Sequence, residues 1–85
     1  MTKAPSGFKV EEMGGGLLAF VQRRAGVEVV ITDERNNLDS SPTDYRWSLG
    51  IYVNGDLMGE VQEGMTLYHA AAEVEEFFAG RQAWV

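Results

Sequence analysis

Alternating apolar and polar residues predict β-structure over most of this chain. The period of two is clearest from Tyr45 to Val53, where every second side chain is aliphatic or aromatic. Shorter runs over residues 8–13, 17–23 and 27–32 each predict a further strand. Glycine-containing turns separate the runs, as in sheets whose neighbouring strands are antiparallel.

The apolar period changes near the C-terminal end of the chain. After the last predicted strand, apolar residues recur at helical spacing, and Thr66 stands where an N-cap residue is expected. Gly80 would end this helix as its C-terminal glycine. We therefore expect a helix over about Leu67 to Ala79, whose buried stripe comprises Leu67, Ala70, Ala71, Val74, Phe77 and Phe78.

Two turns set the predicted strand registers. Residues 24–26 are typical of a three-residue hairpin loop, which would place Val21 opposite Val29. A two-residue turn at Asn54-Gly55 would direct Leu57 away from the face that carries the tryptophan. We therefore predict a three-residue bulged loop at that turn, because a slip of one residue moves a whole strand to the other face.

Together these elements predict an α+β fold, an antiparallel β-meander of four to five strands with one C-terminal α-helix packed on one face. The covered face would hold Leu17, Ala19, Val21, Val27, Val29, Ile31, Trp47, Leu49, Ile51, Leu57 and Val61. The other face would hold an apolar set that we interpret as a sheet-face interface, unless the N-terminal segment or Trp84 covers it: Leu18, Phe20, Val30, Tyr52 and Met58.

The length of 85 residues predicts a single domain, residues 1–85. Within it we expect a flexible leader over residues 1–7 and a tail over residues 81–85, whose Trp84 either packs on the core or contacts a partner. Residues 33–44 consist almost entirely of turn-forming types, so this segment is predicted to be a long mobile loop.

Charge is distributed unevenly along the chain. Thirteen acidic against seven basic residues give a net charge of −6, and no base lies between Trp47 and Gly80. An acidic surface repels phosphate, which disfavours direct binding of nucleic acid. The acids of this base-free region are Asp56, Glu60, Glu63, Glu73, Glu75 and Glu76. They either keep a small domain soluble or form a partner-binding surface for a basic protein.

The residue types present give little support to catalysis or to metal binding. The chain has no cysteine and only one histidine, His69, so thiolate chemistry and a typical zinc site are excluded. Residues 33–39 are acidic, but Arg35 and Leu38 stand where a calcium loop needs an oxygen ligand and a glycine. No lysine follows Gly14-Gly15-Gly16 as in a phosphate loop. We therefore expect a protein that is not an enzyme and has no cofactor.

No run approaches the ~20 apolar residues that span a bilayer, and no signal-peptide core follows the first residues, so we expect a cytoplasmic protein. Residues 45–78, a hairpin followed by an alanine-rich helix, resemble the strand-strand-helix part of HicB-type antitoxins, although that family's proline–aspartate turn is missing. In size, acidity and lack of catalytic groups the chain is similar to small phage accessory proteins, among them anti-CRISPR and host-takeover inhibitors.

Two hypotheses follow from the sequence. The first is a small acidic non-catalytic protein-binding module, an inhibitor that occupies a basic surface of a larger protein, such as a surface that binds nucleic acid. The alternative is a homodimeric assembly module or HicB-like antitoxin, joined through the exposed sheet face. Neither hypothesis involves a membrane.

Overall fold

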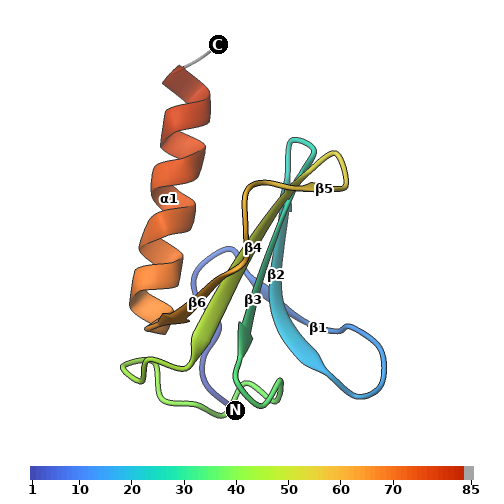
Figure 1. The fold of residues 1–85 in the computed structure, drawn as a ribbon, viewed down its shortest axis with the longest axis vertical. Helices are drawn as coiled ribbons and strands as arrows, with labels where there is room; N and C mark the ends of the chain where they lie inside the picture. The colour runs from blue at the N-terminus through green and yellow to red at the C-terminus, as the bar shows by residue number, and fades with distance from the viewer. Residues whose placement is uncertain (84–85) are drawn as a thin grey trace.

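An antiparallel sheet and one C-terminal helix make up the part of the chain that the computed structural model describes, residues 1–83, with side chains through residue 80 (Figure 1). The sheet order is β1-β2-β3-β4-β5, and β6 also pairs with β4. This confirms the predicted α+β class. The elements are β1 Lys9–Glu12, β2 Leu18–Arg24, β3 Val27–Asp33, β4 Trp47–Val53, β5 Asp56–Leu57, β6 Gln62–Met65 and α1 Leu67–Ala83.

Helix α1 packs on one face of the sheet with the stripe that its spacing predicts. The Thr66 hydroxyl accepts a hydrogen bond from the His69 N–H at 3.0 Å, which confirms Thr66 as the N-cap. The predicted end at Gly80 is wrong, because the helix continues to Ala83 and Gly80 does not adopt the left-handed backbone of a C-terminal glycine. The stripe residues that are buried are Leu67, Ala70, Val74 and Phe78.

The β2–β3 hairpin has a two-residue turn instead of the predicted three-residue loop. Ala25 and Gly26 both have positive φ, 51° and 79°, as in the type I′ turn that matches the twist of paired strands. The register therefore differs by one residue from the prediction, and Phe20 is opposite Ile31. Phe20 is consequently fully buried at 0% exposure on the helix side, where the sequence had placed it on the opposite face.

Ala25 supplies a test of this turn. A left-handed φ strains an alanine, whereas asparagine tolerates it and Asn-Gly is the preferred pair for a type I′ turn. We expect Ala25→Asn to raise the free energy of unfolding by about 0.5–1 kcal/mol in urea denaturation. Ala25→Val should lower it, because a β-branched residue is disfavoured at positive φ. If Ala25→Val were more stable than the wild type, that result would contradict the left-handed conformation of Ala25 and so the type I′ turn.

The β4–β5 hairpin also turns in two residues. Asn54 and Gly55 have φ of 50° and 87°, and Val53 is opposite Asp56, so the predicted bulged loop is wrong. The irregularity lies further along, where the register shifts between the β4–β6 pairs and Gly64 has a φ of 70°. Because of this shift, Met65 and not Val61 lies opposite the tryptophan.

The core lies between the sheet and α1, around Trp47. Its indole stacks on Phe20 with ring centroids 5.8 Å apart, and Nε1 donates to the Ser41 carbonyl at 2.9 Å. Leu38 from the long loop is also fully buried in this core. The prediction that Leu17, Leu57 and Val61 lie in the core is wrong, since all three are exposed.

The sheet face away from α1, here the reverse face, holds a different set of residues from the one predicted. Leu18 and Phe20 pack against the core on the helix side, and Met58 donates its N–H to Ile51 at the sheet edge. Ala19 and Val21, predicted on the covered face, lie with Val30 and Tyr52 on the reverse face. Arg23 pairs there with Glu11 and Glu28, and the Tyr52 ring lies against Gly50.

The N-terminal leader lies along the long loop. The Thr2 N–H donates to the Leu38 carbonyl at 2.7 Å, and the terminal amino group is 3.4 Å from the Asp39 carboxylate. We therefore expect less motion of residues 1–7 than composition alone predicts. The two alternatives for Trp84 fall outside the described residues. Within residues 1–83, α1 is too short and too polar to cross a bilayer.

Candidate functional site

Three of the predicted acidic residues lie along one edge of the sheet. Asp56 begins β5, Glu63 belongs to β6, and Glu60 lies in the connection between these two strands. Both strands pair with the same edge of β4, β5 at its C-terminal end and β6 at its N-terminal end (Figure 1). We refer to residues 56–63 as the acidic edge.

The acidic edge is fully accessible and contains apolar side chains as well as acids. Residues 54–64 form an uninterrupted exposed stretch. Within it Leu57, Met58 and Val61 are 40%, 52% and 42% exposed, which is high for large apolar side chains. This exposed stretch therefore contains three acids and three large apolar residues, and it contains no lysine or arginine.

The three acids of α1 do not join this edge as one patch. Successive helix residues are rotated by about 100°, so Glu75 points to a different side of α1 from Glu73 and Glu76, which are three residues apart and share one side. The Glu73 carboxylate is 3.1 Å from Nε2 of His69, and Glu75 lines a cleft on the far side of the helix. The structure thus divides the predicted set into a sheet-edge group and helix residues on two sides of α1.

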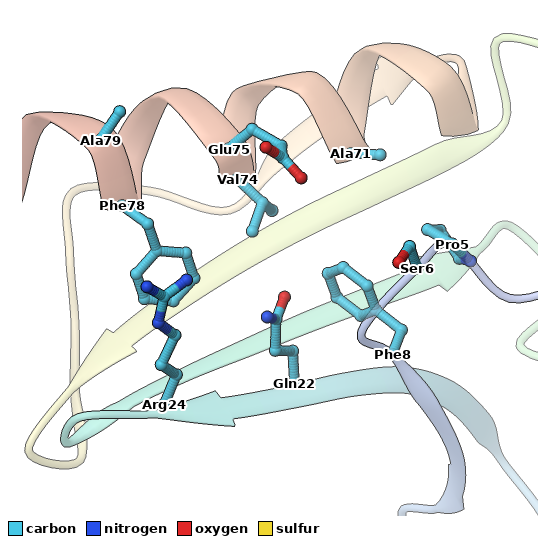
Figure 2. Close-up of a pocket in the computed structure, with 10 residues that line it drawn as sticks. All are labelled: Pro5, Ser6, Phe8, Gln22, Arg24, Ala71, Val74, Glu75, Phe78 and Ala79. Atoms are coloured by element: carbon cyan, nitrogen blue, oxygen red, sulfur yellow. The ribbon is translucent and has the colours of Figure 1, made fainter.

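That cleft, of about 340 Å³, separates α1 from β2 and the N-terminal segment (Figure 2). The Phe8 and Phe78 rings enter it from opposite walls, and the Gln22 amide points between them. The Arg24 guanidinium lies 4.9 Å from the Phe78 ring centroid, a distance suited to a cation–π contact. A second cleft of about 350 Å³ adjoins this one at Pro5.

Neither cleft brings together groups for a known type of catalysis. His69 is exposed and faces Glu73, without a serine or threonine hydroxyl as a hydrogen-bonded nucleophile. Within the described part of the chain, no three His, Asp or Glu residues converge as metal ligands would.

Asp33 is a buried carboxylate that the sequence interpretation missed. At 2% exposure it accepts hydrogen bonds from the N–H groups of Asn37, Leu38 and Ser40 and from the Ser40 hydroxyl, at 2.9–3.2 Å. Burial by itself raises the pKa of Asp33, but these donors outweigh it and the pKa lies below the usual aspartate value. An aspartate that ends a strand and precedes several turn residues is the sequence signal for such a loop.

No protein-family model, curated protein or solved structure matches the chain.

Proposed function

We propose that this chain is a small protein-binding module whose acidic edge occupies a basic surface on a larger protein and thereby inhibits it. The observation that supports this most directly is the uninterrupted exposure of residues 54–64, with three large apolar side chains among three acids. Exposed apolar groups mark interaction surfaces, and the acids around them select the charge of the partner.

The partner that suits this edge combines a basic rim with an apolar depression. Leu57, Met58 and Val61 would enter the depression, and methionine adapts its shape readily to such contacts. The acids would pair with lysine or arginine side chains and accelerate association through long-range attraction. A surface that binds nucleic acid has this charge, so occupancy by the module would compete with that ligand.

Two charge-reversal variants of equal net charge test the proposal. The edge variant is Asp56→Lys/Glu60→Lys/Glu63→Lys, and the matched helix variant is Glu73→Lys/Glu75→Lys/Glu76→Lys. Each takes the formal net charge from −6 to 0, because three acids become three bases. We expect proteins captured from a lysate by the wild type and the helix variant to be lost from the edge variant. With the purified partner, the edge variant should raise Kd at least ~10-fold.

The two variants separate a specific edge from a general effect of charge. Equal loss of binding in both would show that only net charge matters, and binding retained by the edge variant would place the site elsewhere; either result contradicts the proposal. Circular dichroism verifies that both variants are folded, which we expect because the substituted residues lie at the surface.

A further inference from the structure

Strand β1 forms the other edge of the sheet, opposite the acidic edge. Within residues 1–83, β2 pairs with one side of β1 and no strand pairs with its outer side (Figure 1). Three exposed apolar side chains gather on and beside this strand, Val10, Met13 and Leu17, at 42%, 45% and 47% exposure. This edge is regular over Lys9–Glu12, whereas the β5–β6 edge is interrupted.

The registers determine which backbone groups of β1 point outward. The pair that closes the two-residue β2–β3 turn is hydrogen-bonded, so the even-numbered residues of β2 bond to β3 and the odd-numbered ones to β1. The Met13 N–H donates to the Leu17 carbonyl at 2.7 Å, which agrees with this alternation. The N–H and C=O groups of Val10 and Glu12 therefore point away from β2, toward the free edge.

The same alternation restricts how β1 could pair with β1 of a second copy. In an antiparallel pair, opposite residues must both point their backbone groups toward the partner or both away from it. A two-fold axis must then pass through a residue opposite its own equivalent. With Lys9, Glu11 or Glu12 at the axis, like charges would face each other, which disfavours those registers.

We propose that β1 pairs antiparallel with β1 of a second copy of this chain, with Val10 opposite Val10. This register places Lys9 of each copy opposite Glu11 of the other on the reverse face. The two Val10 residues exchange a pair of hydrogen bonds, and each Glu12 N–H can donate to the Phe8 carbonyl of the second copy. The Phe8 N–H is already used within the chain, where it donates to the Pro5 carbonyl at 3.0 Å.

The pairing closes on itself and leaves the proposed binding surface free. A two-fold contact between identical edges uses both of them, so it ends at a dimer. Charged side chains on an edge strand normally prevent such pairing, but here the order of the charges favours one register and penalises its neighbours. Strands of four residues bury little surface, so we expect a weak, reversible dimer.

Sedimentation of the full chain from about 5 μM to 1 mM tests the proposal, since this range covers weak association. We expect the average mass to rise from monomer toward dimer across it. Amide exchange by NMR adds a residue-specific measurement. The Val10 and Glu12 amides should become protected only at high concentration, whereas those of Lys9 and Glu11 should be protected throughout. A monomer at every concentration, or no change at Val10, overturns the proposal.

Val10→Pro removes the outward N–H without removing a hydrogen bond between β1 and β2, and proline is tolerated on edge strands. Val10→Thr keeps the N–H and the β-branched shape, so it is the matched control. We expect at least a ~10-fold increase in dimer Kd for the proline variant, from the loss of two hydrogen bonds, and little change for threonine. Equal association of the two variants contradicts the pairing.

A charge exchange covers the case in which the proline variant does not fold. In Lys9→Glu, a glutamate faces Glu11 of the second copy, and in Glu11→Lys a lysine faces Lys9. Each variant alone should associate more weakly than the wild type, and an equimolar mixture of the two should form heterodimers, because both cross-strand pairs are then complementary. A mixture that associates no better than either variant alone refutes this register.

Discussion

We expect Trp47→Ala to lower the free energy of unfolding by several kcal/mol. The indole is completely buried, stacks on Phe20 and donates to the Ser41 carbonyl, so its loss leaves a cavity and removes one hydrogen bond to that carbonyl. Truncation of a buried tryptophan costs about 3–5 kcal/mol, and a domain of this size has a total stability of about 4–13 kcal/mol. Urea denaturation monitored by circular dichroism should show a midpoint shifted far toward low urea.

Trp47→Phe separates the ring from its hydrogen bond. Phenylalanine keeps the stack on Phe20 and loses the donor to Ser41, so we expect a smaller loss of about 1–2 kcal/mol. If Trp47→Ala lowered the free energy of unfolding by less than 1 kcal/mol, Trp47 would not be at the centre of the core.

The elements of this fold can be predicted from sequence because each has its own period. Alternation over Tyr45–Val53 identifies β4, and the helical stripe that includes Val74 identifies α1. The registers are harder to predict, because a turn that is one residue longer or shorter moves every side chain of the following strand to the other face of the sheet. Ala25 in a left-handed conformation is the reason for the first error, since alanine gives no sequence signal for that φ.

The second register error has a different physical origin. We predicted one bulged turn to keep the returning strand in phase, whereas the chain makes a tight turn and corrects its phase later, near Gly64. Leu57 and Val61 thereby become exposed. The acidic residues of this region could be predicted as a group, but the apolar members of the acidic edge could not, because their exposure follows from that break in the strand.

Asp33→Asn should give the other large loss of stability. The carboxylate accepts four hydrogen bonds, and an amide in its place directs its own N–H groups at donors. Buried N–H groups without an acceptor cost about 1–3 kcal/mol each. Because the loop can relax partly, we expect Asp33→Asn to lower the free energy of unfolding by about 3 kcal/mol in total. The loop also holds Leu38 in the core, so the substitution weakens packing as well. Chemical denaturation at pH 7 measures the difference.

The pH dependence of stability should reveal the same carboxylate. Desolvation raises the pKa of Asp33, but the N–H donors and the Ser40 hydroxyl outweigh it, so the folded-state pKa lies below the unfolded value of about 3.9. Its contribution is therefore complete above about pH 5 and is lost as the pH falls through 3.9 toward the folded-state pKa. Wild type and Asp33→Asn should differ most at neutral pH and converge in acid.

Asp44→Asn is the control for both measurements, because Asp44 is an exposed carboxylate in the same loop. We expect its free energy of unfolding to stay within about 0.5 kcal/mol of the wild type at neutral pH. A constant difference between wild type and Asp33→Asn from pH 7 to pH 3 would mean that the loop is stabilised by the shape of the side chain. If the stabilities of wild type and Asp33→Asn converge in acid while those of wild type and Asp44→Asn stay equal throughout, the stability difference comes from the negative charge of Asp33. That charge holds the three backbone N–H groups and the Ser40 hydroxyl.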